Sequence, residues 1–267
     1  MGIIIKNKYQ ISKIRESGRL ASQVLDMLED HVLPGVTTQY LNDICHNHIT
    51  LIQKAIPSPL LYQGFPKSIC TSINHVVCHG IPSDRKLKKG DIINIDVTVK
   101  KNNYHGDTSR MFLVGDNKRF SIAAKRLVSV SYLCLWKAIQ IVKPGVSLFD
   151  IAKVIEDCAH LNNFSVVEAF CGHGIGESFH EDPQIIHYVP NNQADRTRLR
   201  NIKLKEGMVF TIEPMINIGS KNVTILKDGW TAITKDRSLS AQWEHTVLVT
   251  KRSFEILTLS KKESLGQ

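Results

Sequence analysis

The sequence predicts an α+β fold built from two related halves that face each other about a pseudo-two-fold axis. Three segments of the first half recur, in the same order, in the second half. The pairs are VLPGVT (32–37) with VKPGVS (142–147), LKKGDIINID (87–96) with LKEGMVFTIE (204–213), and HGI at 79–81 with HGI at 173–175. Because an internal repeat usually means a repeated structural unit, we expect one helix-plus-hairpin unit in each half.

Apolar spacing predicts two helices in the first half. Residues 9–30 carry apolar side chains at steps of three, four and seven, which is the pattern of an amphipathic helix. Pro34-Gly35 stops this helix. A second helix is expected after Thr37 or Thr38 as N-cap, with an apolar stripe that continues to Ile52.

The second half repeats this arrangement. A helix is predicted over 121–142, and a further helix through Ala159. Ser147 followed by Asp150 resembles a capping box, in which each residue bonds the backbone of the other and so opens the helix. Each half therefore offers a pair of helices to cover its strands.

The clearest strand is IINIDVTV (92–99), in which apolar and polar residues alternate. One face carries Ile93, Ile95, Val97 and Val99, and the other carries Asn94, Asp96 and Thr98. MVFTIEPMI (208–216) and EHTVLVT (244–250) are predicted as later strands. We therefore expect a core strand with one polar face in each half.

The repeat places a carboxylate, Asp96 or Glu213, on an otherwise apolar strand in each half. If the hairpin after residue 99 turns at Lys101-Asn102, Asp96 lies opposite Asp107, with Cβ atoms about 4.5–5.5 Å apart. Two carboxylates that close cannot both stay ionised unaided. Either the pKa of one rises sharply, as in acid-protease dyads, or a metal ion neutralises the pair.

Two further residues favour the metal. His173 lies in CGHGIG and Glu244 lies in QWEHT. Four carboxylates and one imidazole match the charge of two divalent ions, and such an oxygen-rich set suits Mn²⁺, Fe²⁺ or Co²⁺ better than a structural zinc site does. Taken singly, Glu244 reads as a solvated residue, Asp107 as a turn residue and His173 as a core histidine. The repeat and the hairpin make coincidence the poorer explanation.

Charge, cysteine content and hydropathy bear on whether the protein binds nucleic acid, contains disulfides, is secreted or spans a membrane. The net charge of +9 could assist docking near a polyanion, but no long basic run is present and a solvated basic surface is the simpler interpretation. The six cysteines form no CxxC pair and are expected to be reduced thiols. No signal-peptide pattern and no run of about 20 apolar residues occurs, so a cytoplasmic protein without membrane contact is expected.

Five motifs, in order, carry a resemblance to the type I methionine aminopeptidases of bacteria. They are NHVVCHGIP (74–82), NIDVTV with HGDTSRMF (94–112), CGHGIGESFHEDP (171–183), FTIEPM (210–215) and DGWTAITKDRSLSAQWEHT (228–246). The similarity extends from about residue 7 to residue 258. It implies a pita-bread (creatinase/aminopeptidase) fold, in which helices cover a curved antiparallel sheet. The implied single catalytic domain, 1–267, consists of halves at roughly 7–120 and 121–258.

The resemblance also implies the activity, which is removal of the initiator methionine when the second residue is small. This chain itself begins Met1-Gly2. The implied cofactor is a pair of divalent ions, Co²⁺, Mn²⁺ or Fe²⁺, with Zn²⁺ as an alternative, that activate a bridging hydroxide. The metal ligands implied by the resemblance are Asp96, Asp107, His173, Glu213 and Glu244.

Catalytic and pocket residues follow from the same resemblance. Glu213 is the expected general base and later acid. His79 is expected near the scissile amide nitrogen, and His180 is expected to stabilise the tetrahedral intermediate. The side chains that resemble a methionine pocket are Tyr62, Phe65, Cys70, His79, Phe179, His180 and Trp230. Leu61 departs from the pattern, because relatives commonly have glycine at that position.

The implied partners are the N-termini of nascent polypeptides, with transient ribosome association as a further expectation, and the chain is expected to be a monomer. Two rival interpretations stay open. A prolidase or aminopeptidase P shares the fold and the ligand pattern but usually has an added N-terminal domain, whereas only about 90 residues precede the first ligand strand here. A catalytically inactive binding module, attached to RNA or ribosomes, is the other. Such modules have typically lost metal ligands.

Overall fold

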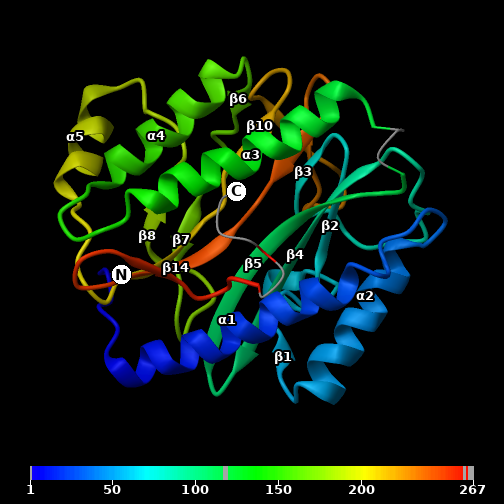
Figure 1. Cartoon of the computed structure of the whole chain (residues 1–267), viewed down its shortest axis with the longest axis horizontal. Helices are drawn as coiled ribbons and strands as arrows, with labels where there is room; N and C mark the ends of the chain where they lie inside the picture. Colours follow the sequence, from blue (N-terminus) through cyan, green and yellow to red (C-terminus); the bar gives the residue numbers. More distant parts are fainter. Residues whose placement is uncertain (1, 117–119, 261–262, 264–267) are drawn as a thin grey trace.

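A computed structural model describes residues 2–116, 120–260 and 263; Met1 lies outside these ranges. Helices cover both sides of a set of antiparallel strands (Figure 1). In the view shown, α3 (Ile122–Gln140) and α4 (Leu148–Leu161) lie above the strands, and α1 (Lys8–Leu28) and α2 (Thr38–Asn47) lie below them. The predicted α+β class is confirmed.

The first pair of helices forms close to the predicted bounds. Helix α1 begins after Asn7, whose side chain accepts from the Gln10 amide in a capping box. Helix α2 begins after Thr37, which caps it as one of the two predicted alternatives. The predicted apolar stripe of the second helix was wrong at its end. A π-helical turn, η1 (His48–Ile52), follows α2 and changes the angular step, so that Ile52 is exposed.

The second pair of helices confirms the predicted capping. Ser121 caps α3, and Ser147 and Asp150 form the capping box that opens α4. The apolar sides of both helices pack in the largest hydrophobic cluster, together with strands of the second half. A short helix, α5 (Gln193–Asn201), follows later in the chain.

Both principal sheets are antiparallel, and the first is built around a long central strand. In the first, β4 (Ile92–Lys101) pairs with β5 (Tyr104–Leu113) on one edge, and with β1 (Ile56–Pro57) and β2 (Cys70–Ile73) on the other. The second sheet has the order β15-β14-β9-β7-β8. Its strands are β7 (Gly172–Gly174), β8 (Glu181–Ile185), β9 (Val209–Ile212), β14 (His245–Val249) and β15 (Phe254–Ile256).

Two three-stranded sheets complete the described fold, with orders β13-β10-β6 and β11-β12-β3. Their strands are β3 (Val76–Cys78), β6 (Ser165–Val166), β10 (Met215–Asn217), β11 (Val223–Ile225), β12 (Ala232–Thr234) and β13 (Ser240–Gln242). A 3-10 turn, η2 (Tyr62–Gly64), precedes β2. The halves meet where Ser109 on β5 and Glu244 before β14 form an antiparallel bridge.

The repeated segments make equivalent contacts. In the first half the Gly35 amide donates to the Leu87 carbonyl at 2.7 Å, and in the second the Gly145 amide donates to the Leu204 carbonyl at 2.9 Å. The two glycines have φ values of 90° and 92°, a conformation that side chains disfavour. The segments repeated in the sequence therefore make the same contact in both halves of the structure.

The predicted register of the β4–β5 hairpin was wrong by two residues. Asp107 lies opposite Thr98, and Asp96 lies opposite Ser109. The turn residues are Asn102 and Asn103, both with positive φ, because asparagine tolerates the left-handed conformation that a tight hairpin turn requires better than lysine does. Since residues two apart share a face of a strand, Asp96 and Asp107 still project to the same side.

The segment 208–216 was predicted as one strand and is two. Strand β9 ends at Ile212, and β10 begins at Met215 in a different sheet. Pro214 lies between them and has no amide hydrogen to continue the ladder. Glu213 is therefore at the break, where its side chain is free to enter the space between the sheets.

The alternation predicted for β4 is confirmed. Its apolar face packs in the hydrophobic cluster formed with α1 and α2, while its polar face turns toward the second half. The six cysteines are free thiols, as predicted. Within the described ranges, no helix has the length and apolar character needed to cross a bilayer.

Candidate metal centre

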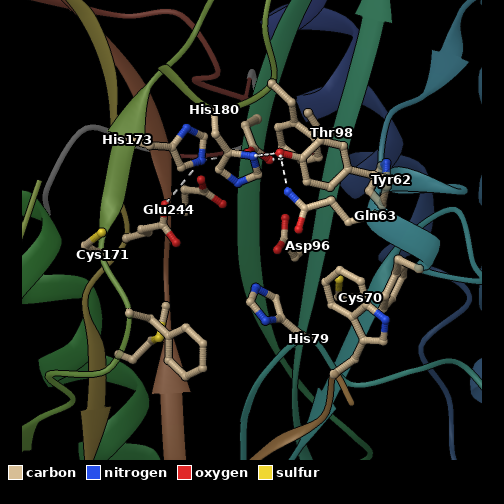
Figure 2. Close-up of a pocket in the computed structure, with 18 of the residues that line it drawn as sticks. Tyr62, Gln63, Cys70, His79, Asp96, Thr98, Cys171, His173, His180 and Glu244 are labelled. Atoms are coloured by element: carbon tan, nitrogen blue, oxygen red, sulfur yellow. Dashed lines mark hydrogen bonds and ion pairs between the residues drawn. The ribbon is translucent and has the colours of Figure 1, made fainter. Parts of the chain in front are cut away.

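A cavity of about 410 Å³ opens between the two halves (Figure 2). Its walls include all five residues predicted as metal ligands and all seven predicted as pocket residues. The ligand candidates are Asp96, Asp107, His173, Glu213 and Glu244. The structure therefore brings together in one space side chains that lie more than half the chain apart in sequence.

Both halves contribute to the group. Asp96 lies on β4 and Asp107 on β5. The Glu244 backbone pairs with Ser109, which brings the carboxylate of the second half beside the hairpin of the first. Asn94 strengthens this junction, because its side-chain amide donates to the Gln242 carbonyl at 2.8 Å.

Three of the five side chains form the tightest cluster. One ligand atom from each of Asp107, His173 and Glu244 lies within 4.8 Å of the others, and all three residues are buried. His173 Nε2 is 3.6 Å from Asp107 Oδ2 and 3.7 Å from Glu213 Oε1. Asp96 and Glu213 lie at the edge of this cluster and are half-buried.

The His173 ring is oriented for ligation. Its Nδ1 lies 3.0 Å from the Gly174 carbonyl, which can only accept, so Nδ1 carries the proton. In the neutral ring Nε2 then keeps a free lone pair that points at the carboxylates. A metal-ligating histidine is usually fixed in this way, by a hydrogen bond from its second nitrogen.

Neutral donors hold the carboxylates in place, and the sequence reasoning did not single them out. The Thr98 hydroxyl donates to Asp107 at 2.6 Å, and the Thr211 hydroxyl donates to Glu213 at 2.7 Å. The Gln242 side-chain amide donates to the other oxygen of Glu213 at 3.3 Å. The sequence did contain a hint of the two threonines. Thr98 is two residues from Asp96 and Thr211 is two residues from Glu213, and this spacing places side chains on the same face of a strand.

Burial and mutual repulsion act against the negative charges. Burial, and then the neighbouring carboxylates, raise the pKa of Asp96 and of Glu244 well above the ordinary values. Burial raises the pKa of Glu213 to about 7, with His173 opposing the shift. For His173 itself burial opposes the charge, but the neighbouring carboxylates of Asp107 and Glu213 outweigh it and raise the pKa.

This donor set fits divalent cations. Four carboxylates share one buried space, and outside His173 no cationic side chain lines the cavity within the described residues. Hard oxygen ligands with one imidazole suit Mn²⁺, Fe²⁺ or Co²⁺ and also accept Zn²⁺. The structure therefore supports the use of divalent metal at this position.

Two histidines without a place in the cluster face the same cavity from opposite ends. Figure 2 shows His180 beside His173 in the upper part of the view and His79 lower down, with Asp96 between them. Burial lowers the pKa of both His79 and His180, for His180 to about 4 with a further contribution from His173. Both rings are therefore neutral at physiological pH.

The proton on His180 can be placed from its neighbours. The Gln63 side-chain amide donates to the Tyr62 hydroxyl oxygen at 3.3 Å. The Tyr62 hydroxyl and His180 Nδ1 lie 2.9 Å apart. When the hydroxyl donates its own proton to Nδ1, the ring proton lies on Nε2. His180 can donate a hydrogen bond from Nε2.

The predicted pocket residues form an aromatic wall around a thiol. Phe65 and Trp230 meet edge to face, with ring centroids 5.2 Å apart, and Trp230 also contacts His79. Cys70 is buried opposite Asp96 across β2 and β4, and burial raises the pKa of its thiol well above the ordinary value. The pocket is thus apolar, and its sulfur stays protonated.

Metal binding is expected to raise the melting temperature more at pH 8 than at pH 5.5. Because the pKa of Glu213 is raised, its contribution favours the folded state below about pH 4.5 and is lost as pH rises through about 7. Above that pH the Glu213 carboxylate is ionised in the folded protein, and a divalent cation binds the ionised form. At pH 8, Mn²⁺ at a hundred times its Kd adds about 2.7 kcal/mol, or roughly 5–10 °C. Calorimetry with Mn²⁺ and with EDTA measures the gain, and an equal gain at both pH values contradicts this account.

Comparisons with known proteins point to one family. The family model of metallopeptidase family M24 matches residues 12–251. A methionine aminopeptidase of Buchnera aphidicola is 51% identical over 100% of this chain and 98% of its own length. The crystal structure of methionine aminopeptidase from Rickettsia prowazekii superposes with a TM-score of 0.90, at 53% identity, over 97% of this chain and 100% of that one.

A more distant neighbour shares the fold alone. Prolidase from Pyrococcus furiosus superposes with a TM-score of 0.73 at 22% identity, over 97% of this chain but 66% of the prolidase. Together with the Rickettsia structure, this neighbour confirms the pita-bread fold that the resemblance implied.

Proposed function

The chain belongs to metallopeptidase family M24, and from that premise we propose that it is a metal-dependent methionyl aminopeptidase. Its substrates are peptides whose N-terminal methionine precedes a small residue, and its reaction is hydrolysis of the first peptide bond. The observation that carries the proposal is the joint presence, in one cavity, of an oxygen-rich ligand set and an aromatic pocket containing a thiol. The identity of about 50% to methionine aminopeptidases over the whole chain supports it.

We propose that Asp96, Asp107, His173, Glu213 and Glu244 hold two divalent ions. The charge of the four carboxylates and the free lone pair of His173 support this assignment. Co²⁺, Mn²⁺ and Fe²⁺ are the proposed ions, with Zn²⁺ as an alternative. When bound, such ions supply an activated water and polarise the scissile carbonyl.

The chain's own side chains complete the reaction. Glu213, with a raised pKa and two fixed hydrogen bonds, takes a proton from the attacking water and passes it to the leaving amine. His180 donates from Nε2 to the oxygen of the tetrahedral intermediate. His79 donates toward the scissile amide nitrogen, and its neutral state suits that role.

The methionine side chain enters the aromatic pocket. An unbranched, polarisable thioether makes favourable contacts with aromatic rings, and a protonated thiol adds a soft neighbour. The residues proposed to bind it are Tyr62, Phe65, Cys70, His79, Phe179, His180 and Trp230. Because this pocket is closed by aromatic side chains, it selects for a long, flexible apolar residue.

Peptide hydrolysis tests the proposal directly. With Mn²⁺ or Co²⁺ the chain is expected to release methionine from Met-Gly-Met and from Met-Ala. A prolidase would prefer Ala-Pro, and the fold shared with prolidases makes this the necessary comparison. Cleavage of Ala-Pro but not of Met-Ala would overturn the proposal. EDTA should stop the reaction, and added metal should restore it.

A His180→Ala variant is expected to lower kcat by about 100-fold, because removal of one donor to the developing oxyanion has an effect of this size. Its metal content should stay at the wild-type level, since His180 is outside the ligand cluster. Steady-state kinetics and elemental analysis measure the two quantities. The control is His160→Ala, which removes an exposed histidine on α4. Loss of metal from the His180 variant would refute the assigned role.

An inactive binding module is the alternative of another class. All five proposed ligand residues line the cavity, which argues against it. Binding of RNA by the metal-loaded protein, without release of methionine from Met-Gly-Met, would favour this alternative.

We also propose the natural substrates, the oligomeric state and the cellular location. The substrates are the N-termini of nascent chains, the chain acts as a monomer in the cytoplasm, and ribosomes are contacted transiently. Residues 1–267 form one catalytic domain with halves at roughly 7–120 and 121–258. The equivalent contacts of Gly35 and Gly145 support this division.

A further inference from the structure

A groove of about 620 Å³ lies beside the catalytic cavity and shares part of its wall. Tyr62, Phe179 and His180 line both spaces. On the proposed function, the substrate's first residue occupies the cavity while the rest of the peptide must leave it. The groove adjoins the cavity at these three residues, so it is a surface that a peptide leaving the cavity can reach.

The shared wall is a rigid stack of rings. Phe179 stacks on His105 with an interplanar angle of 8° and contacts Tyr62 at a centroid distance of 4.9 Å. His105 is itself held by a 2.9 Å hydrogen bond between its Nδ1 and the Gly176 carbonyl. A preformed wall loses little conformational freedom when a peptide lies against it. This ring stack is therefore a preformed surface for a substrate peptide that leaves the cavity.

Leu61 and Ile56 form an apolar rim of the groove, and the backbone at Leu61 is unusual. Leu61 has φ 65° and ψ 4°, the left-handed conformation, although it carries a branched side chain that is 76% exposed. Such a conformation costs a residue other than glycine on the order of 1 kcal/mol. Because the Leu61 side chain is mostly exposed, apolar burial offsets little of that cost. Ile56, 60% exposed on the edge strand β1, extends the same apolar rim.

Strain of this kind is retained where the surrounding structure enforces it, and it concentrates at binding sites. The Leu61 amide donates to the Phe65 carbonyl at 2.7 Å, and the Gly64 amide donates to the Leu61 carbonyl at 3.3 Å. This tight loop therefore holds Leu61 at the rim and carries Tyr62 into the shared wall. A change of side chain at 61 alters the groove and leaves the loop's backbone bonds in place.

We propose that the groove binds the third and fourth residues of the substrate in extended conformation, and that Leu61 makes it select for apolar side chains there. The inference rests on the proposed function. The charged residues of the groove, Lys100 and Glu177, are of opposite sign and give no net preference for charge. Apolar contact with Leu61 and Ile56 is then what distinguishes one peptide from another.

The test compares Met-Gly-Leu-Leu amide with Met-Gly-Ser-Ser amide. We expect wild-type kcat/KM to favour the leucine peptide by about tenfold, the effect of partly burying one or two apolar side chains. A Leu61→Gly variant should reduce this ratio to within twofold, without a lower Tm, because glycine adopts the left-handed conformation freely. The control is Leu161→Ala, an equally exposed leucine on α4, which should keep the wild-type ratio.

The outcomes separate the two claims. If wild type cleaves both peptides at the same kcat/KM, or if Leu61→Gly keeps the tenfold ratio, the groove inference is overturned and the proposed function stands. If neither peptide nor Met-Gly-Met is cleaved by the metal-loaded protein, the proposed function fails and the inference fails with it. A tenfold ratio that is lost only in the Leu61 variant supports the inference.

Discussion

An Asp107→Asn variant is expected to lose at least 1000-fold in kcat/KM, equivalent to about 4 kcal/mol of transition-state stabilisation. Asp107 belongs to the tightest part of the ligand cluster and lies 3.6 Å from His173. Asparagine keeps the size of the side chain and can still accept from Thr98. What it removes is one negative charge, and with it the affinity for a divalent ion.

The same variant should also lose the metal-dependent gain in melting temperature. Because the buried space then contains one charge fewer, the metal-free protein is expected to be no less stable than wild type at pH 8. The control is Asp157→Asn, which removes an exposed carboxylate that pairs with Lys153 on α4. Kinetics and calorimetry are run on both variants with and without Mn²⁺. Wild-type activity in Asp107→Asn would remove this residue from the centre.

Glu213→Gln is expected to lower kcat by about 1000-fold at saturating Mn²⁺, within the range for loss of a general acid–base group. Glutamine can still accept from Thr211, so the side chain should stay in place. It cannot take up the water proton. The effect should therefore exceed the roughly 100-fold loss expected for His180→Ala.

A matched variant separates proton transfer from positioning. Gln242→Leu removes the second hydrogen-bond donor to Glu213 but keeps its carboxylate. Since a donor to the charged form lowers a carboxyl pKa, its loss should raise the pKa of Glu213 and move the acid limb of the kcat profile to higher pH. Rate–pH profiles of the two variants measure the difference. A Glu213→Gln variant with wild-type kcat would exclude this residue as the base.

The sequence predicted that the five proposed ligands lie together, which the cavity bears out, better than it predicted the local geometry that brings them there. The alternation in β4 correctly placed Asp96 on the polar face. The hairpin turn was misplaced, because Asn102 and Asn103, and not Lys101, take the left-handed conformation. The carboxylates still meet, since an error of two residues preserves the face on which a side chain lies. An error of one residue would have separated them.

Contacts between distant segments could not be predicted from one sequence. The hydrogen bond from Gln242 to Glu213 joins β13 to the end of β9, and periodicity contains no information about such pairings. Pro214 did signal a break in its strand, but the neighbouring apolar residues concealed it. The left-handed conformation of Leu61 depends on the loop that closes at Phe65, and only the family resemblance, in which glycine is usual at this position, hinted at it.

The account as a whole depends on divalent ions among the carboxylates of the two halves. A crystal soaked in Mn²⁺ and measured at the manganese absorption edge tests this directly. We predict two anomalous peaks about 3.5–4 Å apart, one beside Asp96 and Asp107 and the other beside His173 and Glu244. An anomalous map without a peak between these side chains, from a crystal that shows bound Mn²⁺ elsewhere, would contradict the account.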